Sequence, residues 1–280
     1  MIRLTGLFLL LLFLGSGLKS QTVAGAVIDG KTKEPLAYVH IGVAGKNVGV
    51  ISNDKGAFNI DLTGIGAEEE IRFSILGYVT RARTKADLTT NGTTVTLEPI
   101  AYELEGIVVT STKGAKVRLG RDKPSKTTTG QSGIDDFGFG GEWGLRVNHE
   151  DHKYYLEEVN FHTRFNTVDS VLFRINVYAI EKGLPGKSLL TKPQFTTSYK
   201  NDKWITANML DHELLIAEDV IVTFELVRIW YGDRGNNALF YTMGKQYPEG
   251  ESFSRESSFA AWEVDARGPI AMYVTGLVQE

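Results

Sequence analysis

From residue 22 onward, apolar residues recur mostly at every second position, in short runs rich in Val, Ile, Tyr and Phe. Gly, Asn, Asp and Pro separate these runs. The pattern is typical of β-strands joined by turns. The chain of 280 residues is 42% hydrophobic, which is enough for two modest cores. The sequence therefore predicts an all-β protein of two domains.

The first domain is expected over residues 21–110. Its strands are predicted near 22–29, 36–44, 48–52, 57–62, 71–75, 79–84 and 93–100. Seven short strands at this spacing indicate a β-sandwich.

The stretch ISNDKGAFNIDL, residues 51–62, allows two interpretations. A calcium loop of the EF-hand kind needs oxygen ligands at alternate positions and a closing Glu, on a helix. Here Asn53 and Asp54 are adjacent and Lys55 follows them. Asn, Asp and Gly also tolerate the positive φ of tight hairpins. We therefore predict a turn between two strands.

The second domain is expected over residues 133–280, as an antiparallel sandwich of jelly-roll type. Its strands are predicted near 143–149, 154–165, 170–180, 194–199, 203–210, 219–230, 238–243 and 270–278. Alternation is clearest in LFRINVYAI, residues 172–180, where Arg174 and Asn176 share one face and Phe173 and Ile175 the other.

Residues 111–132 carry six basic residues against the single Asp122, with Thr and Gly and no apolar period. We interpret them as a basic flexible linker. The alternative is a contact with anionic lipopolysaccharide or lipid head groups.

Residues 1–20 have a basic start, an apolar run and small residues at the end, which predicts a secretory signal peptide cleaved between Gly17 and Ser20. We expect export to the periplasm or outer membrane, with no transmembrane segment. The chain has no cysteine, so no disulfide stabilises it. Loss of Arg3 and Lys19 takes the formal charge from −4 to −6, which argues against nucleic acid as a partner.

The front domain resembles the carboxypeptidase-like regulatory domain, a transthyretin-like sandwich. The resemblance rests on Gly25, Glu34-Pro35-Leu36, Asn53-Asp54, Gly56, Phe58 and Leu76-Gly77-Tyr78. Similar domains precede the plug of outer-membrane receptors in Bacteroidetes, and the back half resembles exported proteins of that group. In that family these residues shape the sandwich and its turns. The sequence carries no peptidase motif, so the resemblance implies no peptidase activity.

Few residue groups suggest chemistry. His149 and His152 in NHEDHKYY are candidate metal ligands, but a charged hairpin turn is the other interpretation. Carboxylates of a glycan-acting hydrolase are the second possibility, with Glu157, Glu158, Glu263 and Asp265 as candidates. There is no G-x-S-x-G elbow and no phosphate loop. We predict no cofactor and no catalytic residue.

Aromatic residues near turns are the best candidates for binding, because a flat ring can stack on a sugar. They are Trp204, Trp230, Tyr231 and Trp262. Core packing is the other interpretation of each ring. The sequence predicts a non-enzymatic, exported cell-envelope module that binds a glycan or an envelope protein. The alternatives are a glycan hydrolase and a purely structural assembly partner.

Overall fold

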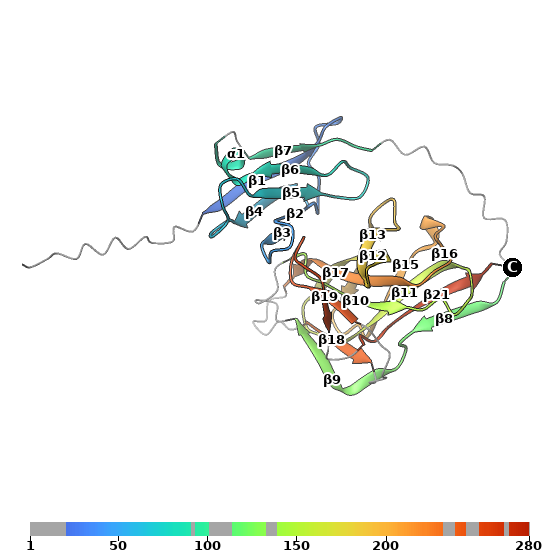
Figure 1. Cartoon of the computed structure of the whole chain (residues 1–280). Coiled ribbons are helices and arrows are strands. Elements are labelled where there is room, and N and C mark those ends of the chain that lie inside the picture. The colour runs from blue at the N-terminus through green and yellow to red at the C-terminus, as the bar shows by residue number, and fades with distance from the viewer. Residues whose placement is uncertain are drawn as a thin grey trace, which may run out of the picture.

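Figure 1 shows the computed structural model of the chain, which describes residues 21–90, 93–100, 114–132, 139–231, 239–244, 252–265 and 269–279. These residues form two β domains, with one short helix, α1 (Lys85–Thr90), and a 3₁₀ turn at Leu210–His212. The predicted all-β class is confirmed. The predicted signal peptide lies outside the described residues. Within them, no helix is both long and apolar enough to span a membrane.

The front domain is a sandwich of two small sheets. One sheet has the order β4-β1-β7 and the other β3-β2-β5-β6, and only the β1–β7 pair is parallel. The bounds are β1 (Thr22–Asp29), β2 (His40–Gly42), β3 (Gly49–Ile51), β4 (Ala57–Asp61), β5 (Glu70–Ser74), β6 (Arg81–Thr84) and β7 (Thr94–Leu97). Each falls within or beside a predicted strand. Their inward Val, Ile, Leu and Phe side chains form one core.

The stretch at residues 51–62 is a turn, as predicted. The Asn53 side-chain oxygen accepts hydrogen bonds from the backbone N–H groups of Lys55 (2.9 Å) and Ala57 (3.0 Å). Gly56 has φ +71°, and a Cβ there would lie 2.6 Å from the Val27 carbonyl oxygen. The turn joins β3 and β4, which belong to opposite sheets, so it is a crossing between sheets rather than a hairpin.

The C-terminal domain packs two larger sheets. The first sheet has the order β13-β12-β17-β10-β19-β20, with β14 also on β12; the second has the order β8-β21-β11-β18-β9, with β15 and β16 also on β11. The first-sheet bounds are β10 (Glu142–Val147), β12 (Ser170–Glu181), β13 (Leu184–Ser188), β14 (Gln194–Tyr199), β17 (Val220–Trp230), β19 (Ser252–Arg255) and β20 (Glu263–Asp265). The second-sheet bounds are β8 (Lys116–Gly120), β9 (Pro124–Ser132), β11 (Tyr154–Asn166), β15 (Trp204–Asn208), β16 (Leu215–Ile216), β18 (Leu239–Gly244) and β21 (Met272–Val278).

The prediction of a flexible linker at residues 111–132 is wrong for most of its length. Residues 116–120 form β8 on the edge of β21, and residues 124–132 form β9 on the edge of β18. In β8, Leu119 is buried while Lys116 and Arg118 point the other way into solvent. Basic residues are common on edge strands, so the many Lys and Arg residues that led us to predict a linker are also compatible with strands. Residues 111–113 lie outside the described part.

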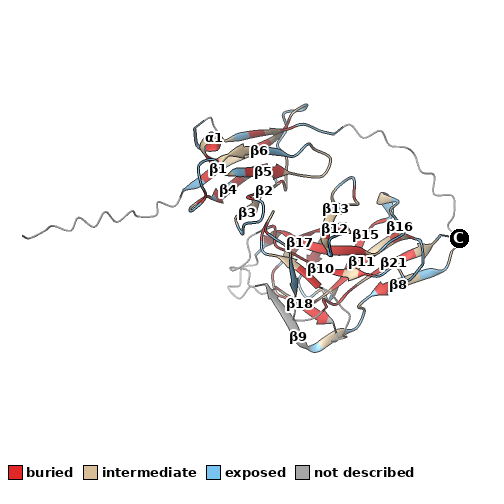
Figure 2. Ribbon diagram, viewed as in Figure 1, coloured by how far each residue is buried: buried red, intermediate tan, exposed pale blue. Residues whose placement is uncertain are grey.

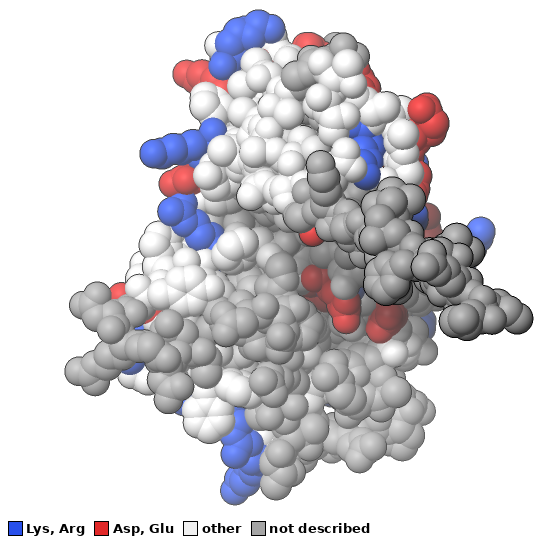
Figure 3. Space-filling model, turned by 90° about the vertical axis from the view of Figure 1, so that its left-hand side faces the viewer, with Lys and Arg blue, Asp and Glu red and all other residues white. Residues whose placement is uncertain are grey.

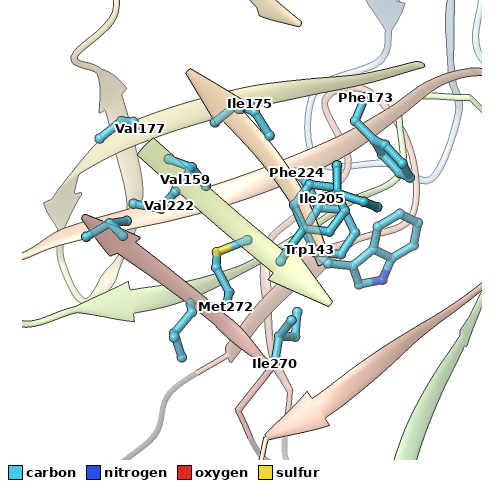
Figure 4. Close-up of a cluster of buried hydrophobic side chains, with 14 of the residues drawn as sticks. Trp143, Val159, Phe173, Ile175, Val177, Ile205, Val222, Phe224, Ile270 and Met272 are labelled. Carbon is cyan, nitrogen blue, oxygen red and sulfur yellow. The ribbon is translucent and has the colours of Figure 1, made fainter. Parts of the chain in front are cut away.

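The core between the two large sheets is aromatic at its centre. The rings of Phe161 and Phe224 stack with centroids 4.3 Å apart, and Phe173 and Trp143 meet Phe224 at 5.8 and 5.9 Å. Trp143 is 3% exposed, so its ring is part of this core. Figure 4 shows the rings of Trp143, Phe173 and Phe224 together with some of the aliphatic side chains of this core.

The first sheet is buried on both faces. In β12, Phe173 and Ile175 point into the core, as the alternation predicts, yet Arg174 and Asn176 on the opposite face are only 2% and 4% exposed. Figure 2 shows buried residues along both β17 and β10. Since the core lies on one side only, something else covers the other side.

Four charged side chains form a row across that other face. In register, Arg174 of β12 lies opposite Glu225 of β17, which lies opposite Glu142 of β10, which lies opposite Arg255 of β19. Arg174 Nη1 is 3.2 Å from Glu225 Oε2, and Arg255 Nη2 is 2.5 Å from Glu142 Oε2. The two carboxylates are thus paired with the two guanidinium groups; we call these four residues the charged row.

Neutral side chains complete the hydrogen bonding of Glu142. Its Oε1 accepts from Asn176 Nδ2 (2.8 Å), from the Tyr178 hydroxyl (3.0 Å) and from the Thr223 hydroxyl. A buried carboxylate is tolerated only when it is paired and hydrogen-bonded in this way.

The front domain covers the charged row. His40 Nε2 lies 2.6 Å from Glu225 Oε1, and Arg174 Nη2 donates to the Tyr38 carbonyl. Arg228 of β17 pairs with Asp54 of the turn at 2.6 Å. The two domains are therefore held by buried polar contacts, with a surface ion pair beside them.

The domains also approach closely through their backbones. The Gly45 N–H donates to the Phe259 carbonyl at 2.9 Å. A Cβ at Gly49 would lie 2.2 Å from the Ser258 carbonyl oxygen, so only glycine fits there.

Ionisation at the interface follows from burial and charge. Burial lowers the pKa of His40, and the attraction of Glu225 offsets this only in part. For Glu225, burial acts to raise the pKa, but Arg174 and His40 outweigh it and hold the pKa well below its usual value. The contact between the domains therefore favours neutral His40 and ionised Glu225.

We expect acid to weaken the folded chain through His40. The unfolded histidine takes up a proton near pH 6.5 and the folded one only at lower pH, so stability is lost as the pH falls below about 6.5. A His40→Gln variant, which does not titrate, should lose less melting temperature than the parent between pH 7 and 5. Thermal unfolding at several pH values measures this. An equal loss in both chains would contradict the assignment, and His152→Gln, at an exposed position outside the interface, serves as the control.

Replacing the central core ring tests the sandwich itself. Phe224→Ala removes a 2% exposed ring that meets four other aromatic rings, so the free energy of unfolding should fall by about 3–5 kcal/mol. Val264→Ala is the control, because Val264 is 57% exposed and its loss should cost less than about 0.5 kcal/mol. Urea unfolding of both variants measures the difference. Equal stability of the two would refute this core.

Candidate functional site

The outer face of the second sheet brings polar and aromatic side chains together. In register, Tyr273 of β21 lies opposite Asn160 of β11, which lies opposite Thr206 of β15. Two residues along, Thr275 lies opposite Glu158. Because side chains alternate along a strand, all of these point away from the core formed by Val159 and its neighbours. We call this surface the outer face.

Two aromatic rings form the centre of the outer face. Trp204 lies opposite His162 in register, and its ring centroid is 5.0 Å from both the His162 ring and the Tyr273 ring. The Arg118 guanidinium lies 4.8 Å from the centroid of Tyr273. Trp204 and Tyr273 are partly exposed, so ring surface remains accessible.

Asn160 is the unusual residue of this face. It is 3% exposed, and its Oδ1 accepts from the Thr206 hydroxyl at 2.6 Å. Its Nδ2 is buried and has no hydrogen-bond partner within the described part of the chain. A buried amide nitrogen without an acceptor costs about 1–3 kcal/mol.

A cavity of about 410 Å³ adjoins these residues. Its lining is Lys116, Val117, Arg118, Glu157, Glu158 and Thr275. The register of β11 on β21 shifts between Leu156 and Glu158, and this bulge brings both glutamates to the cavity. Glu158 Oε2 accepts from the Thr275 hydroxyl at 3.2 Å, and Glu157 lies 3.7 Å from Lys116. The cavity is therefore lined by both basic and acidic side chains, which can donate and accept hydrogen bonds.

His162 is held in its neutral form beside Trp204. Burial lowers its pKa, and nearby Lys203 lowers it further. Its Nδ1 lies 2.7 Å from the Thr242 hydroxyl. At neutral pH the outer face thus presents an uncharged imidazole next to the aromatic pair.

The structure gathers only one of the four predicted aromatic residues into this site. Trp204 lies in it. Trp230 and Tyr231 lie at the end of β17, 38% and 50% exposed, with Arg228 4.7 Å from the Trp230 ring. Trp262 is half-buried and packs on Tyr178 at 5.9 Å, beside the charged row. Ligand binding at these three positions stays a prediction.

Sequence reasoning missed Asn160, Tyr273 and Arg118. Asn160 is a polar residue at an outward position of the strand YYLEEVNFHTRF. It fits the alternation of that strand, so the sequence pattern gave no reason to single it out. Tyr273 is more than a hundred positions away in the chain and meets Asn160 only through strand pairing.

The predicted metal candidates occupy a turn. His149 Nδ1 lies 2.9 Å from Asp219 Oδ1, and the His149 backbone N–H donates to the same oxygen. His152 is exposed, and its backbone N–H donates to the His149 carbonyl across the turn. Glu150 and Asp151 between them have positive φ. Among the described residues, no group of three His, Cys, Asp or Glu side chains is placed to hold a metal.

Removing the polar pair under the rings tests whether Asn160 serves stability. Asn160→Leu combined with Thr206→Val replaces both partners of one hydrogen bond with apolar groups, and it also removes the unpartnered Nδ2. We expect the free energy of unfolding to stay the same or rise. Urea unfolding checks this, with Thr206→Val alone as the control. A loss of 2 kcal/mol or more, about the cost of breaking a well-formed buried network, would mean that Asn160 is structural.

Comparison with known proteins identifies the front domain only. Residues 23–109 match the family model described as CarboxypepD_reg-like domain, in agreement with the resemblance seen in the sequence. No curated protein matches the chain. One solved structure that matches is the "Structure of infectious bursal disease virus Gt strain", at 11% identity and a TM-score of 0.27. The match covers 92% of this chain and 62% of that one, and similarity at this level carries no information about function.

Proposed function

We propose that this protein is an exported, non-enzymatic module of the cell envelope that binds a glycan on the outer face. The observation that carries the proposal is the partly exposed Trp204–Tyr273 ring pair, next to a cavity lined by charged and hydroxyl side chains. A sugar ring presents an apolar C–H face for aromatic stacking and hydroxyl oxygens for hydrogen bonds. The outer face offers both kinds of contact within one sheet.

The cavity beside the rings supplies further partners. The Arg118 guanidinium can donate to sugar hydroxyls, while the Glu158 carboxylate can accept from them. Arg118 and Lys116 are balanced by Glu157 and Glu158, so the surroundings favour a neutral glycan over a polyanion. On the face seen in Figure 3, both basic and acidic side chains are present among the described residues.

The front domain contributes no chemistry to this proposal. A CarboxypepD_reg-like domain is at most a binding or structural module, and here it covers the first sheet. Export rests on the signal-like residues 1–20 and stays a proposal. An envelope protein as the partner, in place of a glycan, is an outcome of the test below.

Binding is tested with the chain from Gln21 to Glu280 and a panel of neutral oligosaccharides. A glycan present at 100 times its Kd adds about 2.7 kcal/mol to stability, which raises the melting temperature by a few degrees. Trp204→Ala should abolish this shift through lost stacking, and Asn160→Leu/Thr206→Val should weaken it about tenfold or more by replacing polar groups of the outer face with apolar ones.

The matched control is Trp230→Ala, which removes an indole at the end of β17 and should leave glycan binding intact. A shift that disappears in Trp230→Ala and survives in Trp204→Ala would move the site to β17. No shift with any glycan would refute the proposal and direct the search to envelope proteins. The same mixtures, analysed for shortened oligosaccharides, show whether Glu157 and Glu158 support hydrolysis instead.

A further inference from the structure

The outer face of the second sheet continues beyond Trp204 to a second aromatic pair. Phe165 of β11 lies opposite Phe240 of β18 in register, and their ring centroids are 5.9 Å apart. Phe165 is 50% exposed, and Phe240 is partly exposed. A group of exposed rings on one face marks an interaction surface, whereas single exposed apolar residues are ordinary. The glycan-binding site described above uses neither of these two rings.

Both rings point to the same side of the sheet as Trp204. Along β18, the residues before and after Phe240 belong to the core, so Phe240 faces outward. Thr242, two residues further along, faces outward as well. Its hydroxyl lies 2.7 Å from Nδ1 of His162, whose ring meets the ring of Trp204. The outer face is therefore continuous from Trp204 to the second aromatic pair.

Strand β11 carries the parts of this surface in order. Glu158 lines the cavity at one end. His162 lies opposite Trp204, and Phe165 follows three residues beyond it. At about 3.3 Å per residue, Phe165 lies roughly 10 Å from His162 and roughly 20 Å from Glu158 along the strand. This length is several times the width of one sugar ring.

Basic side chains accompany Phe165. The Arg164 guanidinium and the Lys203 ammonium each lie 5.7 Å from the centroid of its ring. Arg164 Nη1 also donates to the Lys126 carbonyl, and Lys203 Nζ donates to the Arg164 carbonyl. A guanidinium and an ammonium have more N–H groups than these contacts use, so both can donate to sugar hydroxyls beside the ring.

A glycan fits this surface better than a peptide strand does. Between Glu158 and Phe161, β11 pairs with β21 along one edge and with β15 along the other, so its backbone N–H and C=O groups are already used. A peptide that adds to a sheet needs a free strand edge. Sugar rings need no backbone partner, because they stack on aromatic side chains and accept hydrogen bonds from basic ones.

We propose that the outer face binds an extended, neutral oligosaccharide of several units along β11, with one unit on the Trp204–Tyr273 pair and another on Phe165. Phe165 is then the residue that makes the protein prefer long chains to short ones. This inference rests on the proposed function, because it assigns a ligand length to the same face.

The test measures affinity against ligand length for the chain from Gln21 to Glu280. Oligomers of two, four and six units of β-linked glucose, mannose or xylose are titrated separately by isothermal calorimetry. For a sugar that binds, we expect the affinity to rise about tenfold or more between two and six units, because the longer oligomer reaches the second aromatic pair.

Three variants locate the gain. Phe165→Ala should remove it and leave the two-unit affinity unchanged, because a short oligomer stays on Trp204 and Tyr273. Phe165→Tyr keeps a ring and should retain the gain. Trp230→Ala, which removes a 38% exposed ring of the first sheet, is the matched control and should behave as the parent. Melting temperatures close to that of the parent show that the variants are folded.

Equal affinity for two and six units would overturn the inference and leave the proposed function intact. A gain with length that survives in Phe165→Ala would overturn it as well. If no oligomer binds the parent chain, the proposed function fails, and the inference on ligand length fails with it.

Discussion

The structure depends on the charged row, because it is what allows the first sheet to be buried on both faces. Each ion taken out of water costs several kcal/mol, and pairing repays this only when geometry and hydrogen bonding are good. Here the two carboxylates meet two guanidinium groups across four neighbouring strands, and Glu142 gains three further donors. The front domain supplies the remaining partners: His40 contacts Glu225, and the Tyr38 carbonyl accepts a hydrogen bond from Arg174. A front domain docked in another position would leave these charges without partners, so the row favours one arrangement of the domains.

In this arrangement the two sheets of the C-terminal domain differ in which faces are covered. The first sheet gives one face to the core and the other to the front domain, while the second sheet leaves its outer face accessible at Trp204, Tyr273 and Thr206. Polar residues on a covered face must form hydrogen bonds or ion pairs with one another, as those around Glu142 do. On an accessible face they can contact a ligand, which is the role that we propose for the outer face.

Local patterns were sufficient to predict most of the strands. The seven strands of the front domain and the turn at Asn53 follow from alternation and from turn residues, which act within a few positions. Strand β8 was missed because Lys116 and Arg118 gave an edge strand the composition of a linker.

The sites were much less predictable, because their members meet only through pairing. Nothing local indicates that Asn160 lies opposite Tyr273 and Thr206, or that Arg174 and Arg255 line one cavity. Burial on both faces of β12 could not be predicted from the sequence either. Arg174 and Asn176 alternate with apolar residues, and this pattern is typical of a strand with one exposed face. Among the predicted aromatic residues, sequence could not separate Trp204 from Trp230 and Trp262, because all three lie near strand ends.

The most direct measurement is a crystal structure of the chain from Gln21 to Glu280 grown with a neutral oligosaccharide. We predict one sugar ring against Trp204 and Tyr273, with a hydroxyl oxygen within hydrogen-bond distance, about 2.7–3.2 Å, of a polar side chain of the outer face. An oligosaccharide bound elsewhere on the C-terminal domain, or an ordered water on Asn160 Nδ2 with no sugar at the rings, would contradict it.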